Sequence, residues 1–182
     1  GGLVGMIAKS VYNCKVIGSC GGPEKCRIVK EKYGFDHAID YKKASNKEEL
    51  GALLKEVAPD GIDMYFENVG GMHFEASMGA LRTGGRIAVC GQISDYNTLA
   101  ADYVPLCINP MQMIYTAQRI EGFVCSPWLS GTKGTFLKSM SSWLKDGKLV
   151  VQETYFDGIE SWPDAFQSLF TGKNLGKVVV RV

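Results

Sequence analysis

A strand, a helix and a second strand follow one another near the middle of the chain, and both strands stop in glycine. The apolar runs 62–71 and 86–91 read as buried strands, and the stretch 72–81 between them has the composition of a helix. Strands joined by a crossover helix run parallel. Ligands bind in such sheets just beyond the carboxyl ends of the strands. The sequence therefore predicts a binding site at these two ends, with a pair of ordinary strand-ending turns as the alternative.

The same alternation of strands and helices extends along most of the chain. It predicts an α/β fold with a doubly wound parallel sheet, helices on both faces and right-handed crossovers. A long polar loop, 92–106, follows the central unit, and loops of this length are often functional. The other predicted elements are strands at 15–19, 38–41, 119–125, 149–156 and 177–182, and helices at 24–32, 47–57, 111–117, 135–145 and 162–170.

The chain opens in a helical pattern, whereas a doubly wound sheet is expected to begin with a strand. Apolar residues at Val4, Ile7, Ala8 and Val11 have helical spacing, and no strand precedes them. In the usual strand order the first strand lies between the second and the fourth. We therefore expect the sheet to lack its first strand, between the strands at 15–19 and 62–68.

The composition excludes several classes of partner. The chain has 182 residues and a formal net charge of +1 from 20 basic and 19 acidic residues. This mixed charge pattern offers no basic stripe to nucleic acid and no polybasic patch to a membrane. No apolar run approaches the roughly 18 residues that span a bilayer, and the first residues lack the pattern of a secretion signal. We expect a cytoplasmic protein whose partners are small molecules.

The cysteines and histidines indicate a reducing compartment without a metal site. None of the six cysteines forms a C-x-x-C pair, and four of them lie in or beside apolar strand-like runs. The two histidines, His37 and His73, lie far apart in the sequence, and neither has ligand spacing to a cysteine. We therefore predict that the chain binds no zinc.

Five short motifs occur in order along the chain. They are Gly22-Pro23-Glu24-Lys25, Phe66-Glu67-Asn68-Val69-Gly70-Gly71, Cys90-Gly91-Gln92-Ile93-Ser94-Asp95-Tyr96-Asn97, Ile120-Glu121-Gly122-Phe123 and Gly172-Lys173-Asn174-Leu175-Gly176-Lys177. With these motifs the chain, from Val4 to its last residue, resembles the zinc-free medium-chain reductases. The resemblance is to the group of leukotriene B4 dehydrogenase, prostaglandin reductase and curcumin reductase.

This resemblance implies a Rossmann-type NADP-binding domain over residues 1–148 and a C-terminal segment, 149–182, that returns to a catalytic domain. In the family the catalytic domain, the first strand and most of the phosphate loop come before the position of Gly1. The chain thus resembles the C-terminal part of an enzyme. We expect the 182-residue piece alone to be inactive.

The end of the first predicted strand favours NADP(H) over NAD(H). NAD sites usually place a carboxylate there for the ribose hydroxyls, whereas this chain has Ser19 and Cys20 followed by two glycines. Lys25 falls in the first turn of the next helix, where its ammonium can pair with a 2′-phosphate, aided by Tyr41. The family has its 2′-phosphate contacts at the matching positions. The alternative is that Lys25 is an ordinary solvated lysine.

The resemblance also implies which residues contact the rest of the cofactor. Asn68 and the loop after Gly91 would lie at the nicotinamide half, Phe123 would flank its ring, and Asn174 would reach it from the C-terminal segment. A turn role for Asn68 and a core role for Phe123 are the alternatives. The complete predicted set is Gly1, Lys25, Tyr41, Asn68, Cys90, Gly91, Gln92, Ile93, Ser94, Asp95, Tyr96, Phe123, Val124, Cys125 and Asn174.

The reaction implied is hydride transfer from NADPH to the carbon–carbon double bond of an α,β-unsaturated ketone or aldehyde. No nucleophile–base set or carboxylate pair stands out, which suits a reaction that needs orientation and one hydrogen-bond donor. Tyr96 is the predicted catalytic donor, and its alternative is a loop tyrosine that packs on the surface. Two other functions remain open: a zinc-free NADPH quinone reductase and a non-catalytic NADPH-binding module.

The strand at 119–125 is the expected last strand of the nucleotide-binding sheet. An uncovered apolar edge invites pairing with another chain. The family dimerises through the corresponding strand, so the sequence predicts a homodimer with a two-fold contact along Arg119–Cys125.

Overall fold

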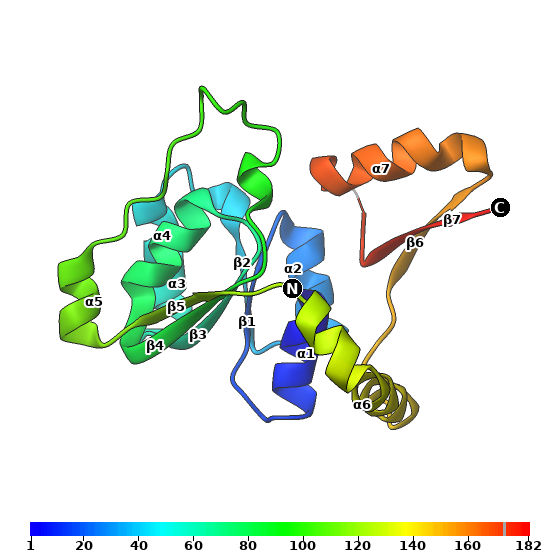
Figure 1. Cartoon of the computed structure of the whole chain (residues 1–182), viewed down its shortest axis with the longest axis horizontal. Helices are drawn as coiled ribbons and strands as arrows, with labels where there is room; N and C mark the ends of the chain where they lie inside the picture. The colour runs from blue at the N-terminus through cyan, green and yellow to red at the C-terminus, as the bar shows by residue number, and fades with distance from the viewer. Residues whose placement is uncertain (173) are drawn as a thin grey trace. The chain divides into compact units, whose positions relative to one another are not determined.

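The structure, a computed structural model, describes residues 1–172 and 174–182, with the side chains of all of these except 128–134. Lys173, in the fifth motif, therefore lies outside the described residues. Contacts between residues divide the chain into two compact units. The first unit is Gly1 with 41–137, and the second is 2–40 with 138–182. Both have the α/β character predicted from the sequence (Figure 1).

The first unit is built on a three-stranded parallel sheet. Its strands are β3 (Ile62–Glu67), β4 (Leu81–Val89) and β5 (Arg119–Gly122), in the order β3-β4-β5. Helix α4 (Gly71–Ala80) connects β3 to β4 and packs on both strands. The predicted strand–helix–strand unit is thus confirmed, and Figure 1 shows the three strands side by side.

One boundary within this unit differs from the prediction. Residues 82–85, which separate the predicted helix from the predicted strand at 86–91, lie inside β4, because the strand begins at Leu81. Ile62 pairs with Leu81 and Met64 pairs with Arg86, so the register shifts between these two pairs. Consecutive glycines allow the strand to bulge, so it begins five residues before the predicted Arg86.

The core of the first unit lies between α4 and the sheet. Phe74 and Met78 of α4 pack with Leu81 and Ile87 of β4, and all four are buried. Partly buried residues of β3, β5, the 92–106 loop and α5 (Pro110–Thr116) extend the same cluster. This apolar packing holds the carboxyl ends of β3 and β4 in place, since burial of such side chains is the main stabilising term in a small core.

Two other helical segments of the first unit precede β3. Helix α3 (Lys47–Val57) packs on α4 and begins in a capping box. The Asn46 side chain accepts a hydrogen bond from the Glu49 N–H at 2.9 Å, and the Glu49 carboxylate accepts one from the Ser45 N–H at 2.7 Å. The other segment before β3 is a single 3₁₀ turn at Tyr41–Lys43, and a second such turn, Ile93–Asp95, follows β4.

The second unit contains two pairs of parallel strands. β1 (Ile17–Cys20) pairs with β2 (His37–Asp40) through helix α2 (Pro23–Glu31), and β6 (Glu153–Asp157) pairs with β7 (Lys177–Arg181) through α7 (Trp162–Thr171). Its core joins Met6 of α1 (Gly2–Ser10) to Phe35 and Leu149. In the described part of the chain β1 pairs only with β2, and β3 pairs with β4 but not with β1. The absence of a first strand from the sheet stays a prediction.

Three further boundaries differ from the predicted ones. Helix α6 (Ser126–Lys145) begins nine residues before the predicted Thr135, with Pro127 in its first turn, a position that proline favours. β5 accordingly stops at Gly122 rather than at Cys125. β6 begins at Glu153 rather than at Leu149, because Leu149 is buried in the core of the second unit.

Candidate functional site

The carboxyl ends of β3 and β4 are joined by backbone hydrogen bonds. The Glu67 carbonyl accepts from the N–H groups of Cys90 and Gly91, at 2.9 and 3.2 Å. The Asn68 carbonyl accepts from the Ile93 N–H at 3.0 Å, and the Val69 carbonyl accepts from the Ser94 N–H at 2.9 Å. Residues 67–69 and 90–94 thus form one continuous edge, and the structure brings together the two strand ends that the sequence marked as a site.

Two glycines allow this close approach. Gly70 is buried with φ +84° and ψ −165°, a conformation almost confined to glycine. An ideal Cβ on Gly70 would lie 2.8 Å from the Ser94 Oγ and would overlap the Gln92 side chain. A Cβ on Gly91 would lie 2.8 Å from the Tyr96 hydroxyl oxygen. The Tyr96 hydroxyl therefore lies directly over the Gly91 backbone.

The loop that carries Tyr96 is organised by its own polar side chains. The Asp95 carboxylate accepts hydrogen bonds from the Gln92 amide and, at 2.9 Å, from the Ser94 hydroxyl. Tyr96 closes the 3₁₀ turn Ile93–Asp95 through its N–H, and 64% of the residue is exposed. The loop therefore holds the phenol beside the strand ends while leaving much of it accessible to a ligand.

The remaining predicted residues of the first unit surround this edge less closely. The Phe123 N–H donates to the Val89 carbonyl at 3.2 Å, and the Phe123 ring lies 6.1 Å from the Phe66 ring between centroids. Val124 and Cys125 follow it and are exposed. Tyr41 contacts the His73 ring edge-on at 4.8 Å. Gly1 is exposed and is grouped with this unit.

Lys25 and Asn174 belong to the second unit. Lys25 lies in the first turn of α2, and its ammonium nitrogen is 3.7 Å from an ideal Cβ on Gly172. Asn174 lies two residues further on and donates from its amide to the Gly176 carbonyl at 3.1 Å. The structure thus brings Lys25 to the loop between α7 and β7 that also carries Asn174.

Two acidic residues near these groups were missed by the sequence analysis. The Asp40 carboxylate, at the end of β2, accepts from the Gly22 N–H at 2.8 Å and so orders the turn before α2. Glu67, at the end of β3, is 1% exposed, and its carboxylate accepts from two N–H groups at the start of α4. The available signal for Glu67 was an acid inside an apolar run directly before a glycine-led helix.

Burial shifts the pKa values of several side chains near the carboxyl ends of β3 and β1. Burial lowers the pKa of His73 while the neighbouring Glu67 carboxylate opposes that shift, and burial raises the pKa of Tyr65 above its usual range. In the second unit, burial and the adjacent Cys26 thiol raise the pKa of Cys20 to about 12. Of these groups only a histidine can carry positive charge, and the lowered pKa keeps His73 neutral near pH 7, so it does not supply charge for a phosphate.

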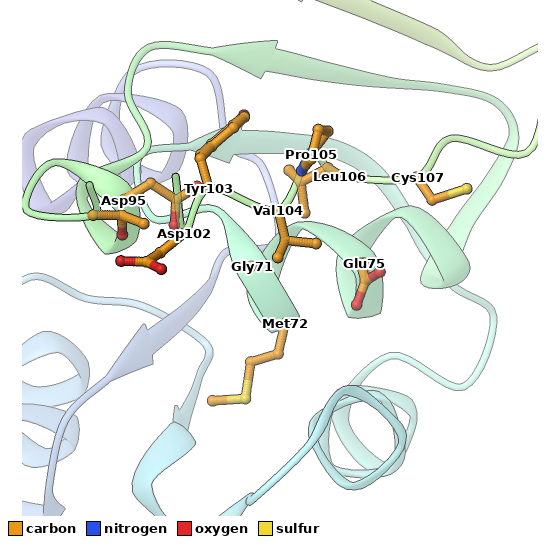
Figure 2. A pocket seen from close by; sticks show the side chains of 11 residues that line it. Gly71, Met72, Glu75, Asp95, Asp102, Tyr103, Val104, Pro105, Leu106 and Cys107 are labelled. Carbon is orange, nitrogen blue, oxygen red and sulfur yellow. The ribbon is translucent and has the colours of Figure 1, made fainter. Parts of the chain in front are cut away.

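A cavity of about 440 Å³ lies beside the N-terminal end of α4 (Figure 2). Gly71, Met72 and Glu75 form the helical wall, and residues 102–107 with Asp95 and Thr98 form the rest. Of the predicted cofactor residues only Asp95 lines it. The Glu75 carboxylate pairs with the Lys47 ammonium at 3.6 Å. This cavity is therefore distinct from the edge formed by Asn68, Gly91 and Tyr96.

Neither a metal-binding cluster nor a membrane-spanning helix occurs among the described residues. Over residues 1–172 and 174–182 no group of three or more His, Cys, Asp or Glu side chains is placed to hold a metal ion. In the same part of the chain no helix is both long and apolar enough to cross a membrane.

Comparison with known proteins supports the resemblance. The chain is 39% identical over 181 residues to prostaglandin reductase 1 of Mus musculus, covering 100% of this chain and 53% of the mouse protein. It is 42% identical over 182 residues to the NADP(+)-dependent 2-alkenal reductase of Nicotiana tabacum, covering 100% of this chain and 51% of the tobacco protein. The chain thus spans about half the length of the curated relatives it matches.

The fold has a counterpart among solved structures. The crystal structure of CurA in complex with NADPH from Vibrio vulnificus matches this chain with a TM-score of 0.87 and 41% identity, over 100% of this chain and 53% of CurA. The family model described as zinc-binding dehydrogenase matches residues 1–146, which is most of the chain. The chain therefore belongs to the zinc-binding dehydrogenase family.

Proposed function

We propose that the full-length protein reduces the carbon–carbon double bond of α,β-unsaturated aldehydes or ketones with NADPH. The observation that carries the proposal is the joined edge of β3 and β4, where the Tyr96 hydroxyl lies over Gly91 beside Asn68. The similarity to a prostaglandin reductase and to an NADP(+)-dependent 2-alkenal reductase supports the substrate class. The similarity to CurA in complex with NADPH supports the cofactor.

The residues around α2 fit a phosphorylated ribose. Lys25 supplies a positive charge in the first turn of the helix, where the helix dipole also favours an anion. β1 itself ends in Ser19 and Cys20, which are not acidic, and the carboxylate of the neighbouring Asp40 accepts from the Gly22 N–H. An ideal Cβ on Gly22 would meet no atom within 4 Å, so the turn before the helix has open space beside it. We propose that Lys25 and Tyr41 bind the 2′-phosphate.

The residues at the strand ends fit a flat ring. Asn68 can both donate and accept hydrogen bonds, and Gly91 leaves the backbone open to close approach. The exposed Phe123 and Val124 offer apolar surface after β5. We propose that these residues and Gly1, Cys90, Gln92, Ile93, Ser94, Asp95, Cys125 and Asn174 complete the cofactor site.

NADPH, when bound, supplies the hydride, and the protein orients the reactants and stabilises charge. Hydride addition to the β-carbon of the substrate moves the double-bond electrons onto the carbonyl oxygen as an enolate, and a proton from water then adds to the α-carbon. In this proposal the Tyr96 hydroxyl donates a hydrogen bond to that oxygen, and a preorganised donor of this kind is a major source of rate enhancement. Asn68 orients the reacting ring, and the Asp95 contacts to Gln92 and Ser94 hold the loop that carries the donor.

The proposal is tested by following NADPH oxidation by the full-length protein. We expect oxidation with a 2-alkenal and none with the saturated aldehyde of the same length. Oxidation with a quinone but not with the alkenal would support a quinone reductase instead. Binding of NADPH without oxidation by either substrate would support a non-catalytic binding module.

The role of Tyr96 leads to a kinetic prediction. In Tyr96→Phe we expect an unchanged affinity for NADPH and a fall of about 10-fold to 100-fold in the rate of the chemical step, because one transition-state donor is lost. Single-turnover kinetics with the alkenal measures this rate. Tyr103→Phe, a substitution of another exposed tyrosine in the same unit, is the control. An unchanged rate in Tyr96→Phe would leave the phenol with a packing role.

We also propose that residues 149–182 pack against a catalytic domain in the full-length protein, with 1–148 as the NADP-binding domain. Three aromatic rings on one face of α7 support this. Trp162 stacks on Phe166 at 5.4 Å and Phe166 meets Phe170 at 5.3 Å, with about half of each residue exposed. A row of exposed aromatic rings is typical of a face that another element covers.

We also propose a cytoplasmic location. The six cysteines of the described chain are free thiols, as is usual in a reducing compartment.

The proposed assembly is a homodimer through β5. Among the strands that the structure describes, β5 pairs with β4 on one side only, and three of its four residues are exposed. Its free edge can therefore pair with the same strand of a second copy. We expect the full-length protein to have the mass of a dimer at micromolar concentration, and Ile120→Pro to lower it to that of a monomer by removing a backbone donor. A monomeric mass for the unsubstituted protein would contradict the prediction.

A further inference from the structure

Glu67 is a buried acid to which neither the prediction nor the mechanism assigns a role. It is the last residue of β3, it is 1% exposed, and no basic side chain forms an ion pair with it among the described residues. Burying a carboxylate is unfavourable unless hydrogen bonds compensate it. An apolar residue would serve better if the position only ended a strand.

The compensating donors lie in the turn that leads into α4. One carboxylate oxygen, Oε1, accepts from the Val69 N–H, from the Gly70 N–H at 3.0 Å and from the Tyr65 hydroxyl at 3.2 Å. The other oxygen, Oε2, is buried with no hydrogen-bond partner. Gly70 is the N-cap of α4 and has no side chain to cap the helix. The Glu67 carboxylate therefore fixes the backbone that leads into α4, because it accepts from the N-cap N–H and from the N–H before it, not from the first turn of the helix.

Asn68 follows Glu67 in the chain and precedes Val69 and Gly70, whose N–H groups donate to the Glu67 carboxylate. The backbone of the turn is tied on its other side to the loop after β4, because the carbonyls of Asn68 and Val69 accept from Ile93 and Ser94. The conformation of residues 68–70 is thus held by Glu67 on one side and by the Tyr96 loop on the other. Removing the carboxylate frees one of these two restraints while leaving the other.

We propose that Glu67 is a positioning residue for the cofactor. Its carboxylate holds the Asn68–Gly70 turn in the shape that presents the Asn68 amide to the nicotinamide half of NADPH. The inference rests on the proposed function and deepens it. It differs from a purely structural role because it predicts a change in cofactor binding by protein that is fully folded.

Three variants of the full-length protein separate these roles. Glu67→Leu removes both acceptors, and Glu67→Gln keeps the shape and one acceptor oxygen. Asp63→Asn is the matched control, an acid on the same strand whose side chain is 78% exposed and pairs with Arg82 at 3.3 Å. NADPH affinity is measured by fluorescence titration at a temperature where circular dichroism shows each variant folded, and the kinetic constants are measured with a 2-alkenal.

We expect the dissociation constant and the KM for NADPH to rise about 10-fold in Glu67→Leu and about 3-fold in Glu67→Gln. The kcat should fall less than 3-fold in both variants. Asp63→Asn should stay within 2-fold of the unsubstituted protein. If Glu67→Leu does not fold, the rise in Glu67→Gln decides. NADPH binding by folded Glu67→Gln within 2-fold of the unsubstituted protein would overturn the inference and leave Glu67 with a role in stability. Absence of NADPH binding by the unsubstituted protein would overturn the proposed function and this inference together.

Discussion

Replacing Lys25 by alanine in the full-length protein should weaken NADPH binding by about 1.5 to 3 kcal/mol, roughly 10-fold to 150-fold, and leave NADH binding almost unchanged. The two cofactors differ only in the 2′-phosphate, so the difference between their losses isolates the contact to that group. Lys25 is half-buried in the first turn of α2, where its charge adds to the positive end of the helix dipole. Titration of the protein with each cofactor measures both losses.

A second lysine on the same helix gives the control. Lys30 lies in the last turn of α2 and is exposed. Lys30→Ala removes the same charge from the other end of the helix, and we expect it to change the affinity for either cofactor by less than 2-fold. Equal losses for NADPH and NADH in Lys25→Ala, or equal losses of NADPH affinity in both variants, would contradict a 2′-phosphate contact and favour a solvated lysine.

The arrangement of strands and helices followed from the sequence because its signals are local. Glycine after an apolar run marks the end of a strand, and the Asn46 and Glu49 pair marks the start of α3, each through contacts a few residues apart. The predicted boundaries were wrong where packing between residues far apart in the sequence determines where an element begins or ends. Leu149 reads as the start of a strand, yet it is buried with Met6 and Phe35 in the core of the second unit, and β6 begins four residues later.

The residues of the candidate site were predicted from the sequence in part, and the contacts between them were not. The sequence predicted Asn68, Gly91 and Tyr96, and the structure brings them together at one edge. It could not show that Tyr96 lies over Gly91, since that depends on the hydrogen bonds between residues 67–69 and 90–94. Glu67 was missed because an acid at a strand end usually faces solvent. Only the fold shows that this one is buried.

Gly70→Ala should be the most damaging single-methyl substitution at the proposed site. Its backbone has φ +84° and ψ −165°, where a side chain costs about 1 to 3 kcal/mol. The added Cβ would also lie 2.8 Å from the Ser94 Oγ and overlap the Gln92 side chain. The turn can relieve this only by moving away from the Tyr96 loop. We therefore expect the free energy of unfolding to fall by about 2 to 4 kcal/mol and NADPH binding to weaken in parallel.

The same substitution nine residues later in the chain should have the opposite sign. Gly79 lies in α4, is exposed, and an ideal Cβ there would meet no atom within 4 Å. Alanine at such a helical position is favoured over glycine by about 0.5 to 1 kcal/mol. Denaturant unfolding of the full-length protein should therefore show Gly79→Ala more stable and Gly70→Ala less stable than the unsubstituted protein. A Gly70→Ala protein as stable as the unsubstituted one would mean that the positive φ of Gly70 does not shape the turn that carries Asn68.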